Sequence, residues 1–186
     1  MYIWVGIDVD DQLADIRGRV SVLEKELGIA NSNLTLPFHI SLKISFPLEG
    51  QAAQEAIEDL ESYYRELSSF AIPVAGIEYH ESICWIRMQE NETLNHIHDK
   101  LNRRLLDRFG VGLHPYDEDY LFHTTLFMDE DAGKVYQAYK AVKDDPLPAV
   151  LYPSAYLIGA SENGALGTYH VKKRIPPAQN LRGRGM

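Results

Sequence analysis

The sequence predicts an α+β protein with two similar lobes related by a pseudo-two-fold axis. Each lobe is expected to be a mostly antiparallel sheet with helices on its outer face, and a central cleft lies between the lobes. Three observations lead to this prediction. The 186 residues suffice for one domain. Helix-like and strand-like stretches follow one another in an order that occurs twice. One five-residue pattern also occurs twice along the chain.

The elements of the first half follow from side-chain periodicity and turn residues. Residues 2–9 are rich in β-formers and predict a strand. Apolar side chains spaced three and four apart, from Leu13 to Leu27, predict a helix that ends near Gly28. The expected order then continues with a loop at 31–33, a strand at 36–46, a helix at 52–67 and a hairpin of strands at 70–79 and 83–88.

The second half repeats that order. Apolar side chains from Leu94 to Leu105 mark a helix at 92–109, which Gly110 ends. A strand at 120–128, a helix at 134–143 and a hairpin of strands at 150–158 and 167–175 follow. We therefore predict one bilobal domain over residues 1–186, with repeat units at about 11–88 and 92–175 and a tail at 176–186.

The doubled pattern is the strongest functional signal in the chain. Residues 38–42 read Phe-His-Ile-Ser-Leu and residues 122–126 read Phe-His-Thr-Thr-Leu. Composition alone predicts about 0.002 such strings in the chain. In a strand, a histidine and a hydroxyl two residues later point to the same face. His39 with Ser41, and His123 with Thr125, would thus each offer an imidazole beside a hydroxyl. A shorter copy, His80-Glu81-Ser82, is interpreted as the end of a hairpin.

The two His-Xaa-[Ser/Thr]-hydrophobic motifs, their wide spacing and the duplicated layout resemble the 2H phosphoesterase superfamily. The similar branch contains 2′-5′ RNA ligase-like proteins and cyclic phosphodiesterases, and the resemblance covers residues 2–175. It implies a metal-independent enzyme that needs no cofactor. His39 and His123 would handle protons, and Ser41 and Thr125 would hold a phosphate. The implied substrates are cyclic (2′,3′-type) or 2′-5′-linked nucleotides or RNA ends.

The residue chemistry is compatible with that reaction. Histidine has an unperturbed pKa of about 6.5, so near neutral pH one copy can be neutral while the other is protonated. One imidazole would activate water, and the other would protonate the departing ribose oxygen. Which histidine is the acid stays open. Ligation, the reverse reaction, is an alternative, as is a nucleotide- or RNA-binding module without turnover, or a purely structural role for the two histidines.

The residues after the two motifs differ. Strand alternation places Lys43 on the face of His39 and Ser41, where it could neutralise a phosphate charge, and Phe127 on the face of His123. Many relatives have a basic residue after the second motif, whereas here Phe127-Met128-Asp129-Glu130 follows. This favours a small nucleotide over a long RNA. Candidates for stacking a base, each with core packing as the favoured role, are Trp4, Tyr79, Trp85, Tyr116 and Tyr169.

Composition limits the partners. The net charge of −9 argues against a protein that grips long duplex nucleic acid. No apolar run is long enough for a membrane helix, and the start of the chain does not resemble a signal peptide. A single cysteine, Cys84, excludes an internal disulfide and a cysteine-rich zinc site. We expect a cytoplasmic monomer that binds no metal and no membrane.

Overall fold

The computed structural model describes residues 1–30 and 36–179 of the chain. The predicted loop at 31–33 and the end of the predicted tail lie outside these residues. The strands are β1 (Tyr2–Asp8), β2 (His39–Pro47), β3 (Ile72–His80), β4 (Ile83–Met88), β5 (His123–Met128), β6 (Val150–Leu151), β7 (Ala155–Ser161) and β8 (His170–Ile175). The α-helices are α1 (Ala14–Leu27), α2 (Gly50–Tyr64), α3 (Glu92–Phe109) and α4 (Ala132–Val142), with 3₁₀ turns at Asp10–Leu13 and Pro115–Asp117.

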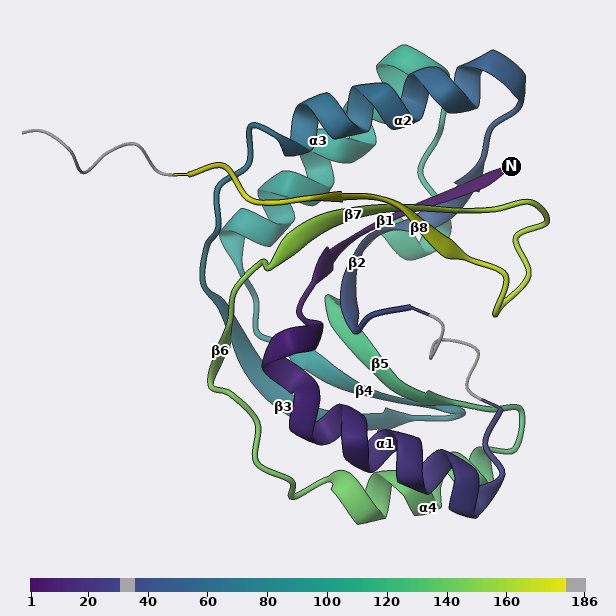
Figure 1. Ribbon diagram of the computed structural model, residues 1–186, viewed down its shortest axis with the longest axis vertical. Coiled ribbons are helices and arrows are strands. Elements are labelled where there is room, and N and C mark those ends of the chain that lie inside the picture. Colours follow the sequence, from purple (N-terminus) through teal and green to yellow (C-terminus); the bar gives the residue numbers. More distant parts are fainter. Residues whose placement is uncertain (31–35, 180–186) are drawn as a thin grey trace, which may run out of the picture.

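The strands form two antiparallel four-stranded sheets, which confirms the predicted α+β class. One sheet has the order β2-β1-β7-β8 and the other β5-β4-β3-β6. The two motif strands, β2 and β5, are each an edge strand of their sheet, and they contact one another. Figure 1 shows the two curved sheets facing each other across the middle of the molecule.

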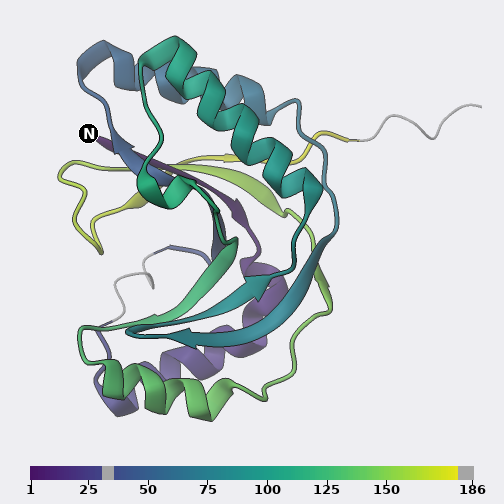
Figure 2. The ribbon, with the colours of Figure 1, turned by 180° about the vertical axis from the view of Figure 1, so that it is seen from behind.

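The helices cover the outer faces of the sheets, as predicted. Helices α2 and α3 pack on the sheet that contains β2, whereas α1 and α4 pack on the sheet that contains β5 (Figures 1 and 2). The stripe of apolar residues predicted for α3 is buried, with Leu94, Ile97, Leu101 and Leu105 inside. Asn91 caps this helix by accepting a hydrogen bond from the Leu94 N–H, and Gly110 ends it with a left-handed backbone.

Each lobe takes elements from both halves of the chain. The hairpin of β3 and β4, from the first half, pairs with β5, and β7 and β8, from the second half, extend the sheet of β1 and β2. Helix α1 packs against α4, and helix α2 contacts α3. The lobes are thus intertwined rather than being the two sequence halves placed side by side. The division into repeat units at 11–88 and 92–175 stays a prediction.

The last predicted hairpin differs from the structure. Residues 150–158 do not form one strand. Val150 and Leu151 pair with β3 in one sheet, and Ala155–Ser161 pairs with β1 in the other. Pro153 lies between the two strands and has no N–H to donate to a ladder. The segment therefore leaves one sheet and enters the other. In the described residues, no helix is long and apolar enough to cross a membrane.

Candidate active site

The two motif histidines occupy the first residue of their strands. His39 begins β2 and His123 begins β5. Both strands then carry a bulge at the same motif position, Leu42 in one and Leu126 in the other. Ser41 pairs with Gly6 and Lys43 with the adjacent Val5, whereas Thr125 pairs with Trp85 and Phe127 with the adjacent Cys84. The doubled sequence therefore folds into a doubled local backbone.

The bulges change where the following residues lie. Simple alternation predicted that Lys43 and Phe127 share the faces of the histidines, with Lys43 available to a phosphate. After the bulge, both residues are buried, with exposed fractions of 2% and 0%. The Lys43 ammonium donates to Asp117 Oδ2 (2.5 Å), to Asn102 Oδ1 (2.6 Å) and to the Gly112 carbonyl oxygen (3.4 Å). Its charge is already paired inside the protein.

The histidine rings are fixed by their own strands. His39 Nδ1 lies 2.8 Å from the Pro37 carbonyl oxygen, and His123 Nδ1 lies 2.7 Å from the Leu121 carbonyl oxygen. A carbonyl oxygen only accepts hydrogen bonds, so Nδ1 carries the proton in both rings. In a neutral ring Nε2 then holds a lone pair and can take a proton. In a charged ring Nε2 can donate one.

Each imidazole also lies against a tryptophan of the neighbouring strand. The ring centroids of Trp4 and His39 are 4.5 Å apart, and those of Trp85 and His123 are 4.6 Å apart. Of the other aromatic candidates, Tyr169 lines the site and donates to Ser45 Oγ. Tyr79 packs on Tyr136 and Tyr139 of α4 instead, and Tyr116 is exposed beside His114.

The two histidines open into one cavity of about 240 Å³. Ser41 and Tyr120 also line it. Thr125 is partly buried on β5 and is not among the described residues that line this cavity. Lys43 also borders this cavity, with its ammonium paired to Asp117. The structure thus brings His39, His123, Ser41 and Lys43 together and leaves Thr125 at their margin.

Burial disfavours the charged form of both site histidines. Burial lowers the pKa of His39, and the charge of His123 lowers it further, against the opposing effect of the Pro37 carbonyl. Burial likewise lowers the pKa of His123, and the Leu121 carbonyl opposes the change. The effect of His123 on His39 is consistent with the two rings opening into the same cavity.

Sequence patterns did not predict a network of buried polar residues next to the site. Its members are Lys43, Asn102, Asp117 and His98. Burial alone would raise the pKa of Asp117, but the Lys43 ammonium and the N–H groups of His114 and Ile44 outweigh it and lower that pKa. Asn102 connects Lys43 to His98, and the ring of His98 stacks on Tyr120 at 4.7 Å. The network thus supports a residue that lines the site, through contacts spanning more than 70 positions of the chain.

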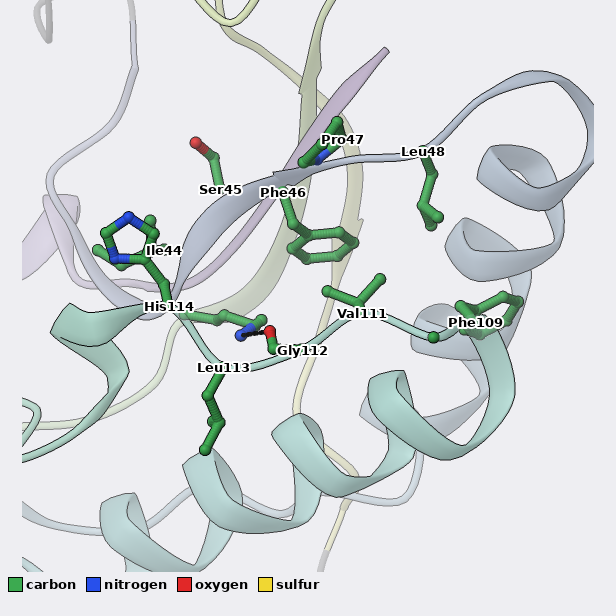
Figure 3. A pocket seen from close by; sticks show the side chains of 12 residues that line it. Ile44, Ser45, Phe46, Pro47, Leu48, Phe109, Val111, Gly112, Leu113 and His114 are labelled. Atoms are coloured by element: carbon green, nitrogen blue, oxygen red, sulfur yellow. Dashed lines mark hydrogen bonds between the residues drawn. The ribbon is translucent and has the colours of Figure 1, made fainter.

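A second hollow continues from the site along β2. Its volume is about 430 Å³, and it shares Lys43, Ile44 and Ser45 with the cavity of the histidines. Figure 3 shows it between the end of β2 and the segment after α3, with Phe46 and Val111 on its walls and Ser45 and His114 on one side. The dashed line marks the bond from the buried Lys43 ammonium to Gly112.

No metal centre is apparent in the part of the chain that the structure describes. Residues 1–30 and 36–179 contain no group of three histidine, cysteine, aspartate or glutamate side chains that could hold a metal ion. The two site histidines are also a poor metal pair, because a serine or threonine hydroxyl is a poor zinc ligand.

Comparison with known proteins identifies the family. Residues 8–155 match the 2′-5′ RNA ligase superfamily. The chain belongs to the 2′-5′ RNA ligase superfamily. Members of this superfamily of 2H phosphoesterases are usually enzymes. No curated protein matches the chain at the sequence level.

Solved structures share the superfamily fold at low sequence identity. The protein TT0787 of Thermus thermophilus is 14% identical, with a TM-score of 0.60 over 97% of this chain and 100% of that one. LigT of E. coli, in its complex with 3′-AMP, is 19% identical, with a TM-score of 0.55 over 95% of this chain and 98% of that one. LigT complexed with ATP is 17% identical, with a TM-score of 0.57 over 96% and 98%. These similarities establish the fold.

Proposed function

We propose that the protein is a metal-independent phosphodiesterase that hydrolyses cyclic (2′,3′-type) or 2′-5′-linked nucleotides or RNA ends. The observation that carries this proposal is the opening of both motif imidazoles into one cavity, each with Nδ1 held by a carbonyl. A phosphorus atom between the two Nε2 atoms would have a proton acceptor on one side and a proton donor on the other. That is the arrangement an in-line displacement needs.

The reaction balances with the groups of the site. One neutral imidazole accepts a proton from water at Nε2 as the water oxygen bonds to phosphorus. The bond from phosphorus to the ribose oxygen breaks, and the second imidazole, protonated at the start, donates its Nε2 proton to that oxygen. Each such proton transfer typically accelerates a reaction by about 10²–10⁴-fold. Ser41 donates to a phosphoryl oxygen from the cavity wall, and Thr125 does so from the margin on β5.

The space around the site suits a nucleoside beside the phosphate. A cavity of about 240 Å³ is small for a nucleotide, whereas ligand pockets commonly measure about 300–1,000 Å³. The adjoining hollow of about 430 Å³ supplies apolar walls and the polar groups of Ser45 and His114. Its one ammonium, that of Lys43, is neutralised by Asp117. An uncharged nucleoside fits this hollow better than a second phosphate. LigT has been crystallised with nucleotides, including 3′-AMP and ATP.

The experiment is hydrolysis of nucleoside 2′,3′-cyclic phosphates and 2′-5′ dinucleotides by purified protein in EDTA. We expect turnover that EDTA leaves unchanged. Loss of activity in EDTA that added divalent metal restores would contradict the mechanism. Ligand-induced shifts in melting temperature without turnover of any substrate would indicate a binding module instead.

A further inference from the structure

The protein contains two tryptophans, and each lies against one of the two site histidines. Trp4 belongs to β1, the neighbour of β2, and Trp85 belongs to β4, the neighbour of β5. The ring planes meet at 38° in the Trp4–His39 pair and at 33° in the Trp85–His123 pair. The same pairing thus occurs in both sheets with closely similar geometry.

The indoles are not held by hydrogen bonds. Neither buried Nε1 has a hydrogen-bond partner among the residues that the structure describes. An unpaired buried N–H costs free energy, and leucine or phenylalanine would fill a core without that cost. What distinguishes tryptophan at these two positions is therefore the flat face of its indole, and not its N–H.

In the sheet that contains β1 and β2, two glycines leave room for the indole of Trp4. A Cβ at Gly159, the residue paired with Trp4 across the ladder, would lie 1.9 Å from Trp4 Nε1. A Cβ at Gly6 would lie 3.0 Å from the Trp4 ring and 3.3 Å from His39 Cδ2. Two glycines thus make the floor on which Trp4 and His39 rest. Beside Trp85, a second histidine, His80, has its ring centroid 6.0 Å from that of the indole.

We propose that Trp4 and Trp85 are positioning residues, each of which fixes the plane of one site imidazole so that its Nε2 faces the shared cavity. The carbonyl of Pro37 or Leu121 holds Nδ1, and the indole face restrains the tilt of the ring. Two restraints of different direction define the orientation of a planar ring. The proposal rests on the proposed function for its catalytic consequence, but the ring geometry stands without it.

An indole face also attracts a cation, so each tryptophan favours the charged form of its histidine. Other charged groups act on the same rings. Asp8, which Arg174 pairs at 2.6 Å, lies opposite His39 across the ladder. Arg87, which pairs with Glu78 at 3.2 Å, lies opposite His123. The tryptophans are therefore one of several influences on the charge of the site, and a test must isolate them.

Fluorescence can isolate them, because a protonated imidazole quenches an indole that it touches. Trp85→Phe leaves Trp4 as the single tryptophan, and Trp4→Phe leaves Trp85. We expect each single-tryptophan protein to lose fluorescence in one transition as the pH falls. His39→Gln should remove the Trp4 transition, and His123→Gln should leave it in place. His123→Gln should remove the Trp85 transition, and His39→Gln should leave it in place. His80→Gln is the control for Trp85, because the His80 ring also lies near that indole. A transition that survives removal of its own histidine would overturn the pairing.

Kinetics tests the positioning role. We expect Trp4→Leu and Trp85→Leu to reduce kcat by about 10²-fold with little change in KM, because a misplaced reacting group loses rate rather than affinity. Phenylalanine at either position should restore most of kcat. Leucine variants as active as the unaltered protein would contradict the role. If the fluorescence pattern appears and no phosphodiester is cleaved, the proposed function fails while the ring pairing holds. Turnover without that pattern contradicts the tryptophan proposal alone.

Discussion

The two halves of the candidate site share a backbone and differ in what surrounds it. His39 and His123 both begin a strand, bind a carbonyl two residues earlier, rest on a tryptophan and precede a bulge. After the bulge one half buries a lysine and the other a phenylalanine. The duplicated part is thus the histidine with its carbonyl, its tryptophan and the bulge, and it is the part to which we assign proton transfer. The residue after the bulge is packed in the interior, as a lysine paired with Asp117 in one half and as a phenylalanine in the other.

The largest difference between the halves should appear in stability. Asp117→Ala leaves the Lys43 ammonium buried without its carboxylate, and we expect a loss of about 3–5 kcal/mol in the free energy of unfolding. Phe127→Leu, at the position equivalent to Lys43 in the other half, leaves no charge unpaired and should cost less than that. Urea denaturation measures both. The double variant Lys43→Met with Asp117→Ala should regain part of the loss. No regain would mean that the ion pair is not what stabilises this half.

The two hydroxyls should differ in their effect on rate. Ser41 lines the cavity and Thr125 lies at its margin. Removing a donor that stabilises developing charge typically costs about 10²–10³-fold in kcat. We expect Ser41→Ala to reach that range and Thr125→Val to fall below it, in steady-state kinetics on a cyclic nucleotide. Equal losses would place both hydroxyls on the phosphate and remove this asymmetry.

Sequence patterns predicted most of the elements and missed what lies behind the site. Periodicity and glycine caps located the helices, and the doubled motif located both histidines. The bulges at Leu42 and Leu126 were not predictable from alternation, because a bulge depends on the partner strand. The Lys43–Asp117 pair joins residues 74 positions apart, and no local pattern marks either as buried. The assembly of each sheet from both sequence halves was missed for the same reason, because strand pairing is a tertiary property.

The glycine floor under Trp4 gives a smaller effect that acts on one half only. Gly159→Ala places a methyl group where the indole lies, and overpacking of this kind costs about 1–3 kcal/mol. We expect a matching loss in unfolding free energy and a reduced kcat, since His39 rests on that indole. Gly18→Ala is the control, because its Cβ would meet nothing within 4 Å. A Gly159→Ala protein indistinguishable from the Gly18→Ala control would show that the floor does not constrain Trp4.

The smallest expected effect concerns pH and stability. Burial lowers the pKa of His39, His98 and His123 below about 6.5, their value in an unfolded chain. Below that pH the unfolded chain binds protons that the folded protein resists binding. Stability should therefore be fully present above pH 6.5 and decline as the pH falls toward the folded pKa values. Urea denaturation at pH 7.5 and pH 5 measures the decline. His39→Gln and His123→Gln should each make it shallower, and unchanged slopes would contradict the burial of these rings.

The central claim is that His39 and His123 each transfer one proton, in opposite directions, to and from a single phosphodiester. The pH dependence of kcat/KM tests it most directly, because a base and an acid in the free enzyme produce the two limbs of a bell-shaped profile. We predict such a bell for the unaltered protein in EDTA. His39→Gln and His123→Gln should each lower the rate by about 10²–10⁴-fold and abolish opposite limbs of the bell. Loss of the same limb in both variants, or full activity in either, would contradict the account.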